Sequence, residues 1–483
     1  MNIFKFEKIV NRFIIEILGI HITLTIKNCW SCNMKNKFNK SNSFDCRAFD
    51  EEIAKKVDKT FKNYKFEPKK VINNNRVAFL ATSFYDMGGH TEWAKKIAEM
   101  LNGKYELTTF LTQKNLTYKN APQKIKLIEK YSNVEGINQG ENLSFRKDLL
   151  SIFNKINEFA PKVIFSFLNT NDVYGAAVLY LLHKYTDIKI VLCNHGSHFP
   201  TLGMSFVDAI GGAFDLDVII NKKYRKQDKS IYLGMIDGQK KDIVDITNDE
   251  KAQIRKKLGI KEGNYFTLSG ATSYKFFDNN IPNEVLTLGR LCEKKSLNPI
   301  ASSYFTMIKK LLEEEPNLEH VVITELIYKQ KKVFDSIFNN SNVKDRIKII
   351  PFTPEYSKIF QSCDLFIDSA PIGSALTHVE LMKHKKISVV FENKLNPLHS
   401  FQEYFPKDYK YKYTNLKDMQ QGVLELLHNE QKRKETENYL YNHYLNTFEG
   451  SVAIETYINV IENADDIEKL YRNAEPIKDY EGV

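Results

Sequence analysis

From Val77 onward, short apolar runs alternate with segments of helical periodicity, and few folds accommodate such an alternation. Strands separated by helices favour parallel, doubly wound sheets. The first series of predicted strands is 77–82, 105–111, 163–168, 188–193 and 217–220, and the second is 265–269, 285–288, 320–324, 347–350, 364–367 and 387–391. The main predicted helices are 49–63, 90–101, 297–314, 354–362, 376–384 and 451–463. We therefore expect an α/β protein with two doubly wound domains.

The length of the chain agrees with two domains plus extensions, since 483 residues exceed what one hydrophobic core usually organises. The segment 222–262 is dense in Lys, Arg and Asp and is the best candidate for the interdomain region. The expected organisation is an N-terminal extension and linker (1–75), a Rossmann-like domain (76–228), a second Rossmann-like domain (229–450) and a helical segment that packs back on the first domain (451–483).

The N-terminal extension is expected to begin with an amphipathic helix. Its apolar face would consist of Phe6, Ile9, Val10, Phe13, Ile14, Ile17 and Leu18. Such a helix can lie on a membrane surface or pack on the protein itself, and both interpretations stay open. No stretch reaches the roughly 18 apolar residues that cross a bilayer, and no signal-peptide cleavage site follows. The expected location is the cytoplasm, with peripheral attachment to the inner face of the membrane as the alternative.

The net charge of +9, from 69 basic and 60 acidic residues, is modest for this length. It is compatible with an anionic substrate, but no basic repeat resembles a nucleic-acid motif, so no nucleic-acid partner is expected. Cys29 and Cys32 are the only closely spaced cysteines, and no second pair completes a zinc site. No metal is expected.

A glycine turn, Gly88-Gly89-His90, follows the first predicted strand and opens a helix. Two glycines allow a ligand to approach the backbone, and the N–H groups of a helix start suit phosphate. His90 would have its pKa lowered by the helix dipole and could donate to a substrate oxygen. The alternative is a simple tight turn.

Two histidines, His195 and His198, follow the predicted strand at 188–193, where open α/β sheets place their ligands. An imidazole of near-neutral pKa can act as general base on an acceptor hydroxyl or bind a phosphate. A purely structural role and zinc binding are the alternatives, although no third zinc ligand is near. Asp208 is a candidate for orienting one imidazole.

A lysine, Lys275, ends a small-residue loop that follows the strand at 265–269. A flexible cation beside such a loop suits a diphosphate. Arg290, with Lys294 and Lys295 nearby, follows another apolar run and competes for this role. Which of the two cationic sites holds the diphosphate stays open.

The most specific motif runs from Asp368 to Glu380 and leads from a strand into a helix. Backbone N–H groups after Gly373, together with the hydroxyls of Ser374 and Thr377, can hold a diphosphate. Glu380 lies about one turn further along the helix and can accept both hydroxyls of a ribose. The alternative is that Ser374 only caps the helix and Glu380 only complements its dipole.

These motifs resemble those of GT-B glycosyltransferases, and the C-terminal half resembles the O-GlcNAc transferase and protein N-glucosyltransferase type. The family pattern of an acidic strand end, a proline, small residues, a threonine and an acidic ribose ligand is matched by Asp368, Pro371, Gly373, Thr377 and Glu380. Phe352 and Thr353 resemble the strand end at which backbone groups of the family bind uracil. The His-Thr-Thr run of O-GlcNAc transferase is replaced by Ala375-Leu376-Thr377, so one donor contact differs.

The resemblance implies two Rossmann-like domains that face each other across a cleft, with a UDP-sugar bound to the second. It implies transfer of the sugar to an acceptor hydroxyl with no cofactor beyond the donor itself. Cationic groups and helix amides would stabilise the leaving diphosphate, and one of the three histidines would handle the acceptor proton. The expected acceptor is a bacterial surface glycan, such as lipopolysaccharide or capsule, or its glycolipid precursor. A protein glycosyltransferase, a UDP-sugar epimerase and an inactive transferase-like subunit are the alternatives, and the oligomeric state stays open.

Overall fold

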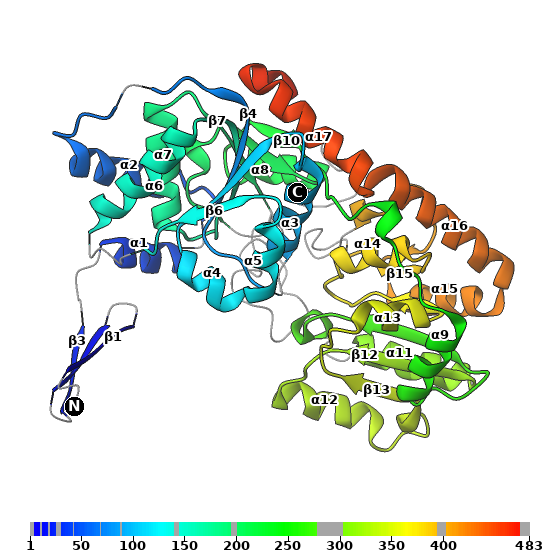
Figure 1. The fold of residues 1–483 in the computed structure, drawn as a ribbon. Helices are drawn as coiled ribbons and strands as arrows, with labels where there is room; N and C mark the ends of the chain where they lie inside the picture. Colours follow the sequence, from blue (N-terminus) through cyan, green and yellow to red (C-terminus); the bar gives the residue numbers. More distant parts are fainter. Residues whose placement is uncertain are drawn as a thin grey trace.

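The structure is a computed structural model. It describes the backbone of three strands before residue 26 and residues 30–41, 43–67, 69–86, 89–139, 144–194, 200–277, 303–393 and 402–473. Two parallel sheets, each flanked by helices, form two domains that lie side by side in Figure 1.

The first domain is built on a parallel sheet of seven strands in the order β10-β9-β8-β7-β4-β5-β6. Helices cover both faces of this sheet, which explains why residues 77–81 form a continuous buried apolar run. The strands are β4 (Asn73–Ala81), β5 (Glu106–Leu111), β6 (Asn133–Gly136), β7 (Pro161–Phe167), β8 (Lys189–Cys193), β9 (Ala209–Gly212) and β10 (Ser230–Tyr232). The helices are α3 (Gly89–Leu101), α4 (Lys114–Asn120), α5 (Pro122–Ile128), α6 (Phe145–Phe159), α7 (Val173–Tyr185) and α8 (Asp215–Lys223).

The second domain has six parallel strands in the order β13-β12-β11-β14-β15-β16, which is the strand order of a Rossmann fold. Its strands are β11 (Tyr265–Gly270), β12 (Leu318–Ile323), β13 (Ile347–Ile350), β14 (Leu365–Ile367), β15 (Ser388–Phe391) and β16 (Lys412–Tyr413). Its helices are α9 (Asn248–Lys257), α11 (Ser303–Glu314), α12 (Tyr328–Phe338), α13 (Tyr356–Ser362), α14 (Leu376–Lys383), α15 (Leu416–His428) and α16 (Glu430–Thr447). The predicted strand at 285–288 lies outside the described residues.

The chain returns to the first domain through α17 (Gly450–Glu462) and the short 3-10 helix at Ala464–Leu470. Ile454, Tyr457 and Ile461 are buried in the same hydrophobic core as Val77 and Trp93 of the first domain. Trp93 Nε1 donates a hydrogen bond to the hydroxyl of Tyr457 at 2.5 Å. The C-terminal helix therefore holds the two domains together by packing as well as by chain connectivity.

We expect Tyr457→Phe to lower the free energy of unfolding by about 1–3 kcal/mol, because the Trp93 indole and the Gly234 carbonyl both lose the Tyr457 hydroxyl as a partner. Urea unfolding followed by fluorescence measures this loss. The control is Tyr439→Phe, which removes a hydroxyl from an exposed side chain and should change stability by less than about 0.5 kcal/mol. Equal stabilities of the two variants would contradict the prediction.

The prediction of an amphipathic helix at the N-terminus is wrong. Residues 4–25 form an antiparallel sheet of β1 (Phe4–Ile9), β2 (Arg12–Ile17) and β3 (Ile20–Thr25). Neighbouring strands pair over their whole length, from Phe4 opposite Ile17 to Ile9 opposite Arg12 and from Arg12 opposite Thr25 to Ile17 opposite Ile20. Hairpin pairing therefore outweighs the helical spacing of the apolar residues.

The prediction of a strand at 217–220 is also wrong, because this segment belongs to helix α8. The Asp217 carboxylate accepts hydrogen bonds from the backbone N–H groups of Ala213 (2.8 Å) and Phe214 (3.1 Å) and thereby caps the start of the helix. Strand β10 pairs with β9, so the first domain extends to at least Tyr232 and not to residue 228.

The helix expected at 49–63 is present as α2 (Arg47–Phe61), but the part expected to be a linker contains a further helix, α1 (Trp30–Asn39). The apolar side chains of both helices, including Phe38 and Ile53, belong to the core of the first domain. The Asp50 carboxylate of α2 accepts hydrogen bonds from the backbone N–H groups of Gly203 (2.7 Å) and Ser205 (3.1 Å). The extension therefore supports the segment that follows the His195–His198 loop.

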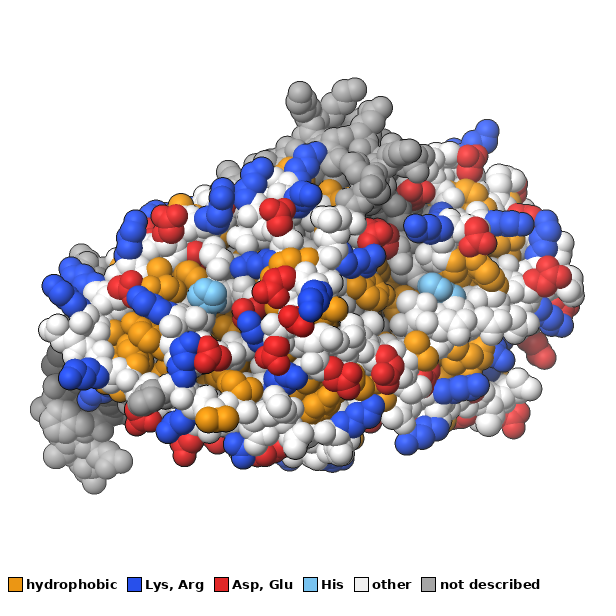
Figure 2. Space-filling view, turned by 90° about the horizontal axis from the view of Figure 1, so that it is seen from above, with side chains coloured by type: hydrophobic (Ala, Val, Ile, Leu, Met, Phe, Trp, Pro, Cys, Tyr) orange, Lys and Arg blue, Asp and Glu red, His pale blue; other side chains and the backbone are white. Residues whose placement is uncertain are grey.

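Basic and acidic side chains are interspersed on the face of the molecule shown in Figure 2. The excess of nine positive charges is therefore not gathered into one patch on this face. Among the helices that the structure describes, none is long and apolar enough to cross a bilayer.

Candidate functional site

Two helix N-termini, one from each domain, meet at the interdomain boundary. Helix α3 starts at Gly89 and helix α14 starts at Leu376. A Cβ atom placed on Gly89 would lie 3.3 Å from Leu376 Cδ1. The glycine turn and the small-residue motif, 287 residues apart in the sequence, are therefore in contact, whereas Gly88 lies outside the described residues.

The segment 368–375, hereafter the 368–375 turn, is held together by its own polar groups. The buried Asp368 carboxylate accepts hydrogen bonds from the backbone N–H of Ser369 (2.9 Å) and of Ser374 (2.7 Å). The Ser374 hydroxyl donates to the Gly270 carbonyl at 3.1 Å. Both polar groups of Ser374 thus support the turn from inside. The partly exposed residues that follow are Ala375, Leu376 and Thr377.

The side chain of Lys275 reaches this turn and donates a hydrogen bond to the Gly373 carbonyl at 2.7 Å. Burial lowers the pKa of Lys275 to about 8, and the negative charge of Asp368 partly opposes this shift. Lys275 is therefore a partly buried cation at the start of α14. Arg290 and Lys295, the competing candidates, lie outside the described residues, so only Lys275 can be placed at the turn.

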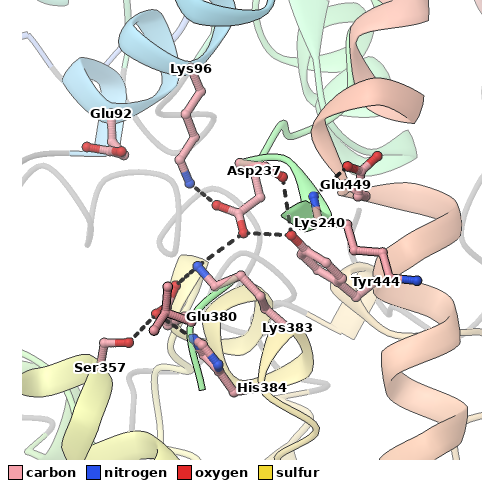
Figure 3. A network of polar contacts seen from close by, with 12 residues as sticks. Glu92, Lys96, Asp237, Lys240, Ser357, Glu380, Lys383, His384, Tyr444 and Glu449 are labelled. Carbon is pink, nitrogen blue, oxygen red and sulfur yellow. Dashed lines mark hydrogen bonds and ion pairs between the residues drawn. The ribbon is translucent and has the colours of Figure 1, made fainter. Parts of the chain in front are cut away.

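Glu380 lies one turn into α14 and is ionised. Ser357 Oγ of α13 donates to Glu380 Oε1 at 2.7 Å, and Lys383 forms an ion pair with Oε2 (Figure 3). His384 Nε2 lies 3.4 Å from Oε1. Although burial raises the pKa of Glu380, these partners outweigh it and hold the pKa well below its usual range. Glu380 is therefore a carboxylate that accepts hydrogen bonds at neutral pH.

The loop between β13 and α13 leads into the first turn of α13, which borders Glu380 through Ser357. Phe352 of this loop and Tyr356, the first residue of α13, expose 45% and 43% of their surface, which is unusual for large aromatic side chains. Thr353 Oγ1 accepts a hydrogen bond from the backbone N–H of Glu355 at 3.2 Å. Burial and the charge of Glu380 raise the pKa of Tyr356. The predicted uracil-binding loop and the predicted ribose ligand are thus neighbours.

His90 is at the start of α3, where its Nε2 atom lies 3.2 Å from the Ser83 carbonyl. Its pKa is lowered, as expected, but burial is the largest cause and not the helix dipole. His195 and His198 lie outside the described residues. Asp208 contacts the backbone N–H of Ile190 at 2.8 Å, near the start of β8. The role of Asp208 in orienting an imidazole stays a prediction, because both histidines lie outside the described residues.

Four residues of the site were missed by the sequence analysis: Ser357, Lys383, Asp237 and Lys96. A signal existed for Lys383, because a glutamate and a lysine three residues apart share one face of a helix. No local signal indicated the other three, which reach the site from α13, from the segment after β10 and from α3. The described ranges contain no cluster of three or more His, Cys, Asp and Glu side chains arranged to hold a metal.

Comparisons with known proteins agree with this architecture. No family model and no curated protein matches the sequence. A glycosyltransferase from Rickettsia africae superposes with a TM-score of 0.60 at 11% identity, covering 82% of this chain and 100% of its own. HepE from Anabaena, solved with UDP and glucose, has a TM-score of 0.56 at 12% identity, covering 80% and 99%. The lipopolysaccharide outer core galactosyltransferase WaaB has a TM-score of 0.52 at 10% identity, covering 80% and 99%.

These solved structures are similar over nearly their whole length, although few residues are identical. The similarity covers 80–82% of this chain, so both domains contribute to it. Identities of 10–12% establish the fold and not the substrate. The chain has the GT-B fold, that of these glycosyltransferases.

Proposed function

We propose that the protein is a glycosyltransferase that moves a sugar from a UDP-sugar to a hydroxyl of a glycan acceptor. The observation that carries this proposal is the arrangement around α14. An ionised Glu380 and a partly buried Lys275 flank the N-terminus of that helix, and Gly89 of the other domain lies opposite. The carboxylate suits the ribose hydroxyls and the cation suits the phosphates of a nucleoside diphosphate. Gly89, which has no side chain, lets the two helix starts approach each other.

In the reaction, the bond between the anomeric carbon and the β-phosphate oxygen breaks while the acceptor oxygen bonds to that carbon. Negative charge develops on the leaving diphosphate, where Lys275 and the amides of residues 375–377 would stabilise it. Thr377 would add a hydroxyl donor, and Glu380 would accept from the ribose. The acceptor proton would pass to a base, for which His195, His198 and His90 are the candidates.

HepE was solved with UDP and glucose, which supports UDP as the nucleotide of the donor. WaaB is a lipopolysaccharide outer core galactosyltransferase, which supports a bacterial surface glycan, lipopolysaccharide or capsule, as the acceptor. The N-terminal strands replace the helix that favoured a membrane surface, so the acceptor proposal depends on the fold and the sequence resemblance alone.

The test is a thermal-shift panel of nucleotides and nucleotide sugars, followed by transfer assays with each ligand that stabilises the protein. We expect UDP and one UDP-sugar to raise the Tm, and label from that sugar to appear in a glycan acceptor. Label in peptides would indicate a protein glycosyltransferase, and free epimerised sugar without acceptor would indicate an epimerase. No stabilisation by any nucleotide would refute the proposal and favour an inactive subunit.

The affinity for UDP should decrease above pH 8. Only protonated Lys275 attracts the diphosphate, and burial places its pKa at about 8. Below that pH the cation is present; above it the affinity falls by up to about tenfold per pH unit. Calorimetry at pH 8 in buffers of different ionisation enthalpy should show proton uptake on UDP binding. Lys275→Met should abolish the uptake, and a flat pH profile of the unsubstituted protein would contradict this assignment.

A further inference from the structure

A chain of alternating charges crosses the domain boundary and ends at Glu380. Lys96 of α3 pairs with Asp237, Asp237 pairs with Lys383 at 3.3 Å, and Lys383 pairs with Glu380 (Figure 3). Two ammonium groups and two carboxylates leave the chain of contacts electrically neutral. We call these four side chains the interdomain relay.

The segment that carries Asp237 connects β10 of the first domain to α9 of the second, and we call residues 233–247 the hinge segment. It is anchored to the junction of α16 and α17. Tyr444 donates a hydrogen bond to Asp237 Oδ2 at 3.1 Å, and the backbone N–H of Asp237 donates to the Phe448 carbonyl at 2.8 Å. The backbone N–H of Lys240 donates to Glu449 Oε1 at 2.8 Å. Asp237 therefore occupies a fixed position between the domains.

The members of the relay depend on one another because they are largely withdrawn from water. The Asp237 side chain is 4% exposed, and the Lys96 and Lys383 side chains are 19% and 17% exposed. A charge that loses its partner in such surroundings keeps its desolvation penalty without compensation. If one side chain of the relay moves, its oppositely charged neighbour is therefore favoured to move with it and keep the ion pair.

The Glu380 carboxylate has capacity left for a ligand. A carboxylate offers about four acceptor positions, of which Ser357 and Lys383 each use one and His384 approaches a third. Lys383 stands between Glu380 and Asp237, so its position sets the direction in which the remaining lone pairs of Glu380 point. The first domain controls that position through Lys96 and Asp237.

We propose that Lys383 is a positioning residue through which the first domain and the hinge segment orient Glu380 for the ribose of the donor. This inference depends on the proposed function, since it takes Glu380 as the ribose ligand. Its consequence is that a donor site on the second domain is complete only when the first domain is in contact. Contact of the first domain with the second and the affinity for the nucleotide are then linked through the interdomain relay.

The first experiment measures the affinities of UDP and 2′-deoxy-UDP by calorimetry for the unsubstituted protein, Lys383→Met and Lys383→Arg. Lys383→Met should weaken UDP binding about tenfold and bring the preference for UDP over 2′-deoxy-UDP close to one. Lys383→Arg should restore most of that preference. The control Lys309→Met removes a lysine of α11 outside the relay and should change neither value.

The second experiment tests transmission from the first domain. Lys96→Met should weaken UDP binding about threefold, although Lys96 belongs to α3, and should have no additional effect in the Lys383→Met background. The control Lys155→Met, which disrupts the ion pair of Lys155 with Glu135 in the first domain, should bind UDP normally. Additive effects of Lys96→Met and Lys383→Met would overturn the relay.

The failure of this inference is distinguishable from the failure of the proposed function. If the unsubstituted protein binds UDP with ribose preference and Lys383→Met does the same or binds tighter, the relay is refuted and the transferase proposal stands. If the unsubstituted protein binds no nucleotide, both are refuted. Equal unfolding midpoints of the variants ensure that changes in affinity are not changes in folding.

Discussion

In the Glu380→Gln variant the affinity for UDP should fall by about 10- to 100-fold, as expected for hydrogen bonds to a charged group worth about 1.5–3 kcal/mol. Glutamine has nearly the same shape, but it supplies one acceptor oxygen and no charge. It also leaves the Lys383 ammonium without one of its two carboxylate partners. Isothermal titration calorimetry with UDP measures the loss.

The affinity of Glu380→Gln for inorganic pyrophosphate should stay within about twofold of that of the unsubstituted protein, because the substitution removes a ribose contact and no phosphate contact. Glu313→Gln is the matched control, since Glu313 lies on α11 and is about half exposed. Unchanged UDP affinity in Glu380→Gln would refute the assignment of Glu380 to the ribose.

Lys275→Met should lower kcat for sugar transfer by about 100- to 1000-fold, the usual effect of removing one group that stabilises charge in a transition state. Methionine fills the space of the lysine stem and contributes no cation at the Gly373 carbonyl. The leaving diphosphate then loses its partly buried positive partner. Steady-state assays with the UDP-sugar identified by the ligand panel provide the measurement.

The Lys275→Met variant should lose activity without losing stability. Burial lowers the pKa of Lys275, which means that the charged form is penalised in the folded protein. Lys275→Met removes that penalty, so its Tm should equal or exceed that of the unsubstituted protein. Lys309→Met, a lysine of α11 that is paired with Glu313, is the control and should keep full kcat. A lower Tm in Lys275→Met would assign the loss of activity to damaged folding.

Much of the fold could be predicted because parallel strands between two layers of helices must be apolar on both faces. The segments 105–111, 347–350 and 387–391 were therefore predicted as strands, and the structure has a strand within each of them. The short strands β6, β9 and β10 were not predicted. Residues 209–212 contain two glycines and resemble a loop, and they pair with β8 only because neighbouring strands provide hydrogen-bonding edges.

The candidate site was predictable only in part. Glycine turns and the motif around Glu380 follow from local rules, since helix N-termini and small residues are needed wherever backbone approaches phosphate. Ser374 shows the limit of such rules, because its hydroxyl donates to Gly270, 104 residues away in the sequence. Whether a hydroxyl serves a ligand or the protein depends on that distant carbonyl.

From the sequence alone follow the alternation of strands and helices, the two-domain division and the residues that start α3 and α14, because each depends on neighbours a few positions apart. Tertiary structure alone decided that Gly89 meets Leu376, that Lys275 donates to the Gly373 carbonyl and that Lys96, Asp237 and Lys383 connect the first domain to Glu380. These contacts join segments that are 98 to 287 residues apart, and only the burial of both cores brings such segments together. Local propensity depends on neighbouring residues only and cannot indicate which distant segments meet. The packing of the two cores determines those contacts.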